Sequence, residues 1–547
     1  MTTHERRVSI FSVIGMTVFI SLVSRMWTGL DTPDSSFYAS LALFGDQVTD
    51  RAPFDSYYWT RLGYIAPVRG LISLTTSDIG FGLYRVLLIA IIVTSIYSIA
   101  YRFSRNARTA AYLTTAVSLS SVMLSYLGNP YLTGSILAAT CAVSALAMTH
   151  KIPSAIAAGI VLGWSAQVNP AGSLLVGTLF IAIGIFMRQR PKYFLIAAIF
   201  TVMTFLAFIV IGTRMFPSLD WWETVNATRG ITLNNFSSKS PVWLTDISLL
   251  VPLAVLIVSI KSWWLDRTND AFRLALVISS VSVSFLLVFS PIMGGIALEA
   301  PMYQAMLWPP AMIATALLFT NMKLNIWWVY ALSIIAILGA GFLQPTLTFP
   351  LGIAIMLGMV LVMTVVRVKK FNKTFASVLA LTIFLGSAQL LQNSRTDLGL
   401  YYLSPYSWAF ATNPIGAKVS SAIKVQEWLL ANTNSTDQIL TWVDGNWTEG
   451  DRELYVVAAM QLWGENRLTL EPEVDDYARA IVQRVKPNVI ALYGRSQSAI
   501  DTMLVSLKEN DFATSNPECI DFTWPVADNS RFPADSGIAC LSRLSLS

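Results

Sequence analysis

Two carboxylates in a short polar segment near the N-terminus are the first candidates for chemistry. The stretch GLDTPDSSFY over residues 29–38 contains Asp31 and Asp34, and Tyr38 follows Asp34 by one helical turn. A carboxylate here could act as a general base that removes the proton from an attacking hydroxyl or amine. Alternatively, Asp34 only caps a short amphipathic helix over residues 35–44, since helix N-termini favour a carboxylate.

The same segment continues into a mixture of aromatic and cationic side chains. Four aromatic residues between positions 57 and 64 lie beside two arginines, Arg61 and Arg69. Guanidinium groups bind phosphate through paired hydrogen bonds, so both arginines are candidate substrate-binding residues. The alternative is an interfacial belt, because aromatic side chains often lie where a membrane meets water.

A third candidate is an acid in a short loop late in the chain. Glu299 is the only charged residue of the stretch GGIALEAPMY over residues 294–303. It could face a substrate, or it could simply be solvated. Asp220 and Glu223 flank two tryptophans, a pattern that favours an interfacial anchor over a catalytic site.

Composition excludes several classes of function. Of 547 residues, 54% are hydrophobic and 13% are charged, whereas a soluble globular chain carries about a quarter charged residues. Only two histidines are present, His4 and His150, which argues against a histidine zinc site or a Ser-His-Asp triad. The net charge of +5 is spread in small clusters and does not indicate nucleic-acid binding.

The elements that must position these residues are membrane-spanning helices. Apolar runs of roughly 20 residues predict an α-helical polytopic membrane protein with about thirteen transmembrane helices. The runs begin near Val8, Phe81, Thr109, Leu132, Ile152, Ala171, Tyr193, Leu244, Leu274, Gln304, Asn325, Leu347 and Thr374. The stretch 152–187 is too long for one span, and Gln167, Asn169 and Pro170 interrupt it, which predicts two helices joined by a tight turn.

Basic residues alternate along these predicted spans, and this alternation predicts the orientation. Arg6 and Arg7 precede the first span, and every second loop afterwards contains Lys or Arg, so the N-terminus is expected inside. An odd number of spans then places the tail outside. We therefore predict a transmembrane domain over residues 1–392, with a large first outside loop over 27–80, and an extracytoplasmic domain over 393–547. A second large outside segment covers 214–243.

The tail has the composition of a small α/β domain. Residues 438–443 and 488–493 predict strands, and residues 475–485 and 498–507 predict helices. Strands that alternate with helices are typical of an α/β fold. Cys519 and Cys540 could form a disulfide in an oxidising compartment, or remain two buried thiols.

In order and layout, these features resemble the GT-C superfamily of membrane glycosyltransferases, in its protein-O-mannosyltransferase and aminoarabinose-transferase branch. The family's Asp-Glu-x-x-Tyr motif after the first helix is similar to Asp34-Ser35-Ser36-Phe37-Tyr38. Its Ala-Gly-x-x-x-Gly helix resembles residues 158–163, and its Glu-x-Arg-Tyr segment before prolines resembles the stretch from Glu299 to Pro310. Ser35 replaces the family's Glu and Met302 replaces its Arg beside Tyr303, so neither motif is intact.

This resemblance implies a function, a site and partners. The expected enzyme moves a sugar from a polyprenyl-phosphate carrier to a lipid, glycan or protein acceptor on the outer face of the membrane. Asp34 is the implied catalytic base with Asp31 in reserve, and Glu299 and Tyr303 join the arginines as substrate-binding residues. The resemblance implies no certain cofactor; a divalent metal is an option, and the loss of the family's Glu at Ser35 argues against dependence on it. A bacterial plasma membrane is the expected location.

Two other classes of protein remain as alternatives. A polytopic transporter predicts internal repeats and ionisable residues within spans, neither of which is prominent here. A non-catalytic assembly protein of the cell envelope would use the outside domain to bind a partner. The activity of variants at Asp31 and Asp34 discriminates between an enzyme and such a scaffold.

Overall fold

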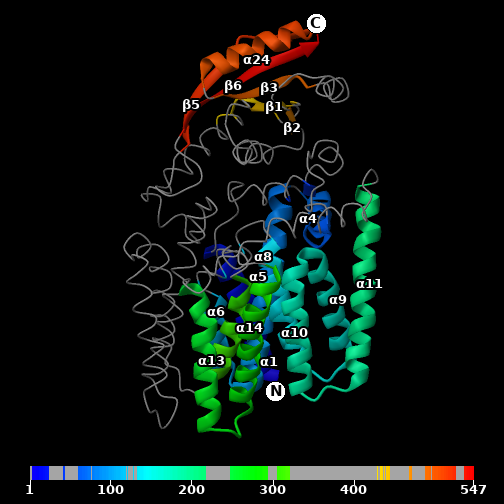
Figure 1. Ribbon diagram of the computed structural model, residues 1–547, viewed down its shortest axis with the longest axis vertical. Helices are drawn as coiled ribbons and strands as arrows, with labels where there is room; N and C mark the ends of the chain where they lie inside the picture. Colours follow the sequence, from blue (N-terminus) through cyan, green and yellow to red (C-terminus); the bar gives the residue numbers. More distant parts are fainter. Residues whose placement is uncertain are drawn as a thin grey trace. The chain divides into compact units, whose positions relative to one another are not determined.

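The computed structural model describes most of the first two-thirds of the chain and parts of the tail. The longer described stretches are residues 3–23, 60–75, 77–118, 132–216, 247–293, 305–320, 467–470, 487–494, 496–524 and 535–546. Shorter ones are residues 38, 41–42, 120, 123, 127, 428, 431–434, 437 and 439–443. The described residues fall into two compact units, one a helical bundle and the other built around a sheet (Figure 1).

The first unit consists of helices. They are α1 (Thr3–Val23), α4 (Leu62–Leu74), α5 (Ser77–Ser104), α6 (Ala107–Ser118), α8 (Leu132–Ala147), α9 (Ile152–Val168), α10 (Pro170–Phe186), α11 (Pro191–Met215), α13 (Ile247–Leu265), α14 (Asp270–Met293), the 3-10 turn η3 (Ala305–Leu307) and α17 (Trp308–Phe319). Every predicted apolar run from Val8 to Gln304 corresponds to a helix, and the runs near Asn325, Leu347 and Thr374 lie outside the described residues.

Several of these helices have the length and composition of membrane spans. Within the described ranges, three are long and apolar enough to cross a bilayer, namely Ile79–Ser104, Pro191–Met215 and Asp270–Val288. The segments 132–147, 152–168 and 170–186 are shorter apolar helices. Exposed leucine, isoleucine and valine side chains cover the outside of the bundle, as lipid contact requires.

The predicted break between α9 and α10 is confirmed, and Asn169 explains it. Asn169 leaves the helical conformation, and its side-chain oxygen accepts the backbone N–H of Gly172 at 3.1 Å. Pro170 follows at the first position of α10, where its missing N–H costs nothing. Two helices therefore meet without an intervening loop.

One end of the bundle, which we call the α4 end, gathers the starts of α4, α5 and α8. Arg85 of α5 donates a hydrogen bond to the carbonyl oxygen of Ser21 in the last turn of α1. The hydroxyl oxygens of Tyr84 in α5 and Ser135 in α8 lie 2.8 Å apart. This contact joins the N-terminal halves of α5 and α8.

The opposite end, the turn end, holds the connections between helices and many of the basic residues. The ring of His150 after α8 lies 3.1 Å from the side-chain oxygen of Gln189 after α10, and Arg273 of α14 lies over the ring of Phe186. The connections α5–α6, α8–α9, α10–α11 and α13–α14 carry Arg102, Arg105, Arg108, Lys151, Arg188, Arg190, Lys192, Arg267 and Arg273. In Figure 1 the N-terminus lies near this end.

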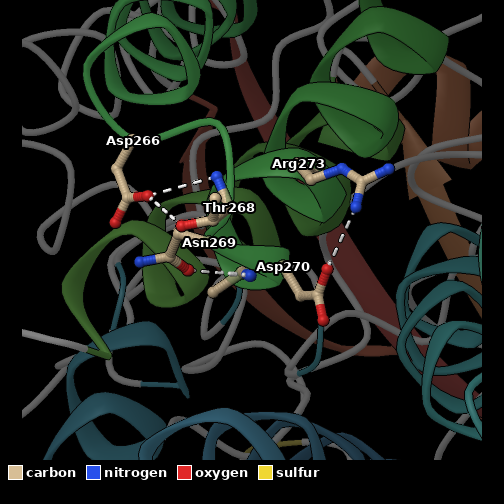
Figure 2. A network of polar contacts seen from close by, with 6 residues as sticks. Asp266, Thr268, Asn269, Asp270 and Arg273 are labelled. Carbon is tan, nitrogen blue, oxygen red and sulfur yellow. Dashed lines mark hydrogen bonds and ion pairs between the residues drawn. The ribbon is translucent and has the colours of Figure 1, made fainter.

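Polar contacts close the α13–α14 turn (Figure 2). The carboxylate of Asp266 accepts the hydroxyl of Thr268 at 2.7 Å, and Asn269 accepts a backbone N–H in the first turn of α14 at 3.0 Å. Asp270 pairs with Arg273 one turn along α14, at 3.3 Å. Both carboxylates bond to groups of the turn itself or of the first turn of α14, so the network stabilises this connection.

The second unit contains a mixed sheet. Its strands are β1 (Ile439–Val443), β2 (Arg467–Leu470), β3 (Val489–Gly494), β4 (Phe512–Thr514), β5 (Glu518–Trp524) and β6 (Asp535–Leu546). The order is β2-β1-β3-β6-β4, with β1 parallel to β2 and β3, β6 antiparallel to β3 and β4, and β5 also paired with β6. Helix α24 (Gln497–Glu509) packs Ile500, Met503 and Leu507 onto one face of the sheet.

Several elements predicted for the tail are present in this second unit. The strands predicted over 438–443 and 488–493 are β1 and β3, and the helix predicted over 498–507 is α24. Cys519 and Cys540, which face each other across β5 and β6, form a disulfide. The helix predicted over 475–485 and the domain boundary predicted at 392/393 lie outside the described residues.

Candidate functional site

The start of α4 is held by three consecutive residues that contact three different helices. Leu62 packs against Gly212 of α11, where any side chain would collide with the leucine. A Cβ on Gly63 would lie 2.7 Å from a backbone nitrogen in the last turn of α9. The ring of Tyr64 meets that of Tyr84 edge to face, with centroids 5.5 Å apart. This first turn is therefore firmly anchored at the α4 end.

Two predicted substrate-binding residues, Arg61 and Arg69, belong to this segment. Arg61 immediately precedes α4, and its carbonyl oxygen accepts the backbone N–H groups of Tyr64 at 3.0 Å and Ile65 at 3.2 Å. Arg69 lies two turns further along the same helix. Its Nη1 atom is buried and makes no hydrogen bond to any residue in the described ranges. This segment thus carries two guanidinium groups, and that of Arg69 has a buried N–H group that could donate a hydrogen bond.

Helix α4 lies within residues 27–80, the predicted outside segment, at a place where the sequence patterns had predicted no helix. Residues 62–74 are helical, and α5 already begins at Ser77. Pro67 and two glycines obscure the helical pattern. The signal that could have revealed it is the apolar spacing of Leu62, Ile65 and Val68, all of which are buried.

Arg85 is a buried cation that the sequence analysis did not select. It lies in the third turn of α5 and is 7% exposed. One of its N–H groups donates a hydrogen bond to the carbonyl oxygen of Ser21, in the last turn of α1. The available signal was a charge four residues into the apolar run predicted to begin near Phe81, since charged residues within spans usually have a functional or structural role.

The remaining predicted site residues fall into two groups. Tyr38 is helical and fully buried, as are Leu41 and Ala42, and these three group with the second unit. The predicted helix over 35–44 agrees with these three positions. Asp31, Asp34, Glu299 and Tyr303 lie outside the described residues. Within the described ranges, no three His, Cys, Asp or Glu side chains gather in a group that could hold a metal ion.

The Ala-Gly-x-x-x-Gly segment of α9 serves helix packing. A Cβ on Gly159 would collide with the carbonyl oxygen of Ala197 in α11, and a Cβ on Gly163 would lie 2.5 Å from that of Thr201. Small residues spaced by four let two helix backbones approach closely inside a membrane. This motif therefore attaches α11 to the bundle.

The polar residues that end α9 are also engaged with the backbone. Gln167 is 2% exposed, and its amide donates to the carbonyl oxygen of Phe205 in α11 at 3.2 Å. Trp164 donates its indole N–H to the carbonyl oxygen of Gly63 at 2.7 Å. Together with the Asn169 cap, these contacts use the polar break to hold α4, α9, α10 and α11 together.

Comparison with known proteins identifies similar folds. No protein-family model matches the sequence, and no curated protein sequence matches it significantly. The structure of ArnT from Cupriavidus metallidurans bound to undecaprenyl phosphate superposes with a TM-score of 0.52 at 12% identity, covering 99% of this chain and 98% of that one. The apo state of the same protein gives a TM-score of 0.52 at 13% identity, with 98% of both chains covered.

These matches establish the fold over nearly the whole length of the chain. ArnT is a GT-C aminoarabinose transferase, and GT-C was the resemblance drawn from the sequence motifs. A further structure, the arabinofuranosyltransferase AftD from Mycobacteria, gives a TM-score of 0.42 at 11% identity, covering 98% of this chain and 40% of that one. The apolar helices and this fold together make the chain a multi-pass membrane protein.

Proposed function

We propose that this chain, which has the GT-C fold of ArnT, is a glycosyltransferase that takes its sugar from a polyprenyl-phosphate carrier. The observation that carries the proposal is the fold match along 99% of this chain and 98% of ArnT. A match of that extent includes both the bundle and the sheet unit. It therefore reflects more than the similarity of a few helices that unrelated membrane proteins can share. The order of the sequence motifs points to the same class independently.

The donor is expected to bind through its phosphate. The similar ArnT structure contains undecaprenyl phosphate, a lipid whose headgroup is a phosphate. In this chain Arg61 and Arg69 are on one anchored segment, and Nη1 of Arg69 is buried without a hydrogen-bond acceptor among the described residues. A buried guanidinium donor is costly unless an anion accepts from it, and a phosphate oxygen is suited to that role.

Asp34 is the proposed general base, and Asp31 is the reserve. The polyprenyl phosphate is already a good leaving group, so the enzyme needs to position the acceptor and remove its proton. Attack opposite the departing phosphate inverts the anomeric carbon. Arg61 or Arg69 would neutralise the phosphate as it leaves. Glu299, Tyr303 and Tyr38 complete the proposed substrate site, which is expected on the extracytoplasmic side.

The replacement Asp34→Asn tests this assignment. Asparagine caps a helix almost as well as aspartate, so folding and membrane insertion should survive. An amide cannot accept the proton, and the expected loss in turnover of polyprenyl-phosphate sugars is about a hundredfold or more. The assay compares purified parent and variant, with thermal stability measured on the same samples.

The matched control is Asp270→Asn, since Asp270 lies in the α13–α14 turn and is assigned no part in catalysis. Equal stability and equal turnover of the Asp34 variant would leave Asp34 as a helix cap and transfer the role to Asp31. Full activity of both variants would contradict the general-base mechanism altogether. An inactive parent, tested against a panel of carrier-linked sugars, would contradict the glycosyltransferase assignment.

A further inference from the structure

We propose that Trp164 is a positioning residue for the donor-binding arginine Arg61. Its indole N–H takes the place of the backbone N–H that α4 lacks at Pro67. This hydrogen bond fixes the position of the first turn of α4 against α9. The proposal rests on the proposed function, because it assigns Arg61 to the donor phosphate. It concerns a residue that neither the sequence motifs nor the fold match selects.

The hydrogen bonds of α4 contain a gap created by Pro67. In an α-helix the N–H of each residue donates to the carbonyl four residues earlier, so residue 67 would donate to Gly63. Proline has no N–H, and its ring also pushes that carbonyl aside. The carbonyl oxygen of Gly63, in a fully buried residue, would therefore be left without its helical donor.

Trp164 fills this gap from another helix. Its Nε1 atom donates to the carbonyl oxygen of Gly63 at 2.7 Å, although the two residues are 101 positions apart in the chain. Freed backbone groups in membrane helices are satisfied in this way by neighbouring helices. The contact is thus a substitute for a helical hydrogen bond.

The glycine makes the contact possible. A Cβ on Gly63 would lie 2.8 Å from the carbonyl oxygen of Trp164 itself and 2.7 Å from the backbone nitrogen of Val168. Only a residue without a side chain allows α4 to rest directly on the last turn of α9. Gly63, Pro67 and Trp164 therefore work as one arrangement across two helices.

Arg61 lies two residues before the anchored carbonyl. Its own carbonyl begins the α4 hydrogen bonds, so any loosening of the first turn displaces its side chain. Phosphate binding by a guanidinium depends on paired, directed hydrogen bonds and is weakened by small displacements. Loss of the indole N–H should therefore weaken binding of the polyprenyl-phosphate sugar, through the displaced side chain of Arg61.

A double-mutant cycle isolates the indole donor. Trp164→Phe removes the N–H, and Pro67→Ala restores an N–H that can donate to Gly63. The loss of indole volume is the same in both backgrounds, so it cancels. Hydrogen exchange of the α4 amides should rise about tenfold in Trp164→Phe, as is typical for an unsatisfied buried carbonyl, and return near the parent value in the double variant.

Donor binding is followed with undecaprenyl phosphate as the probe. Its Kd should rise about tenfold or more in Trp164→Phe and recover in Trp164→Phe/Pro67→Ala. In an Arg61→Ala background, Trp164→Phe should cause no further rise, since the effect acts through Arg61. The same chemical change at Trp264, an exposed residue of α13, should alter neither measurement.

Each outcome decides the proposal. A parent that does not bind undecaprenyl phosphate overturns the proposed function and, with it, the role of Trp164. A parent that binds the lipid while Trp164→Phe binds equally well overturns only the positioning role. Failure of Pro67→Ala to rescue the variant, or an additive effect with Arg61→Ala, also overturns it. Protection of the buried Cys141 thiol checks in every case that the bundle is folded.

Discussion

Asp437 is a buried carboxylate whose partners tie together the starts of two strands and the end of a third. Its oxygens accept from the backbone N–H of Asn434, from the amide of Asn488 and from the guanidinium of Arg543, each at 2.8 Å. Burial by itself raises the pKa of a carboxyl, but these hydrogen bonds and the charge of Arg543 hold the pKa of Asp437 below its ordinary value. The ionised form therefore stabilises the sheet unit.

Acid should consequently weaken this unit through Asp437. Its contribution is complete above the unfolded pKa of about 3.9 and is lost as the pH falls through the lower folded pKa. Asp437→Asn should cost about 1–3 kcal/mol at pH 7, mostly through the buried hydrogen bonds, because the Arg543 side chain is 54% exposed and its charge is screened.

The measurement is urea unfolding of the full chain, read by proteolysis of the sheet unit from pH 3 to pH 7. The difference between parent and variant should be constant above about pH 4 and shrink below it. Asp521→Asn on β5, where the side chain is exposed, serves as the control and should cost little. A difference that does not change with pH would refute the assignment to the ionised carboxylate.

At the scale of elements, α11 depends on α9 for its attachment. Most of its apolar side chains, including Leu195, Ile199 and Leu206, are exposed for contact with lipid. The backbone of α11 approaches α9 most closely at Gly159 and Gly163, where no Cβ can be accommodated. Packing of this kind replaces the hydrophobic effect, which does not drive apolar helices together in lipid.

Gly163→Ala should therefore loosen the bundle. The added methyl would lie 2.5 Å from the carbonyl oxygen of Thr201 and 2.7 Å from Cβ of Thr204, so the helices must separate at an expected cost of about 1–3 kcal/mol. Gly177→Ala in α10 is the matched control, because its new methyl would meet no atom of another helix within 4 Å in the described part of the chain.

Cys141 supplies the readout for this pair of variants. It is the chain's one cysteine outside the disulfide, and it is buried in α8. The temperature at which a thiol-reactive dye labels it reports the melting of the bundle. A clear decrease is expected for Gly163→Ala and none for Gly177→Ala. Equal melting of the two variants would show that the close contact is not needed.

At the scale of the whole molecule, charge is distributed unequally between the two ends of the bundle. The described connections at the turn end and the helix turns beside them carry nine basic residues, whereas the α4 end carries Arg61, Arg69 and Arg85 and the break at Asn169 carries none. Cytoplasmic loops are enriched in Lys and Arg, which supports the proposal that the turn end faces the cytoplasm. The Cys519–Cys540 disulfide supports the complementary proposal that the sheet unit is outside, in an oxidising compartment.

Cysteine labelling of intact cells tests this orientation. Ser498→Cys at the start of α24 should react with an impermeant maleimide, because the position is exposed and expected outside. Lys151→Cys in the α8–α9 connection should react only after the membrane is permeabilised. The native Cys141 is buried and should contribute no background. Labelling of both positions from the same side would exclude the odd number of spans predicted between them.

The sequence alone determined the features whose signals are local. Apolar length located the helices from Val8 to Gln304, because a bilayer demands long runs without charge. The break at Asn169 and Pro170 was visible because both residues act on the backbone beside them. Strands β1 and β3 stood out as short apolar runs, and the motifs indicated the GT-C fold. The catalytic role of Asp31 and Asp34 stays a prediction from those motifs.

Only the tertiary structure decided that residues 62–74 form helix α4 and which groups complete its hydrogen bonds. Pro67 and its neighbouring glycines argue locally against a helix, and they are tolerated because α9 supplies the missing donor and receives Gly63. The burial of Arg85 likewise depends on the carbonyl oxygen of Ser21 in α1, which lies 64 positions earlier and cannot be predicted from the residues around Arg85. A backbone group in an apolar surrounding must find a partner somewhere, and when that partner is a hundred residues away, only the folded chain specifies it.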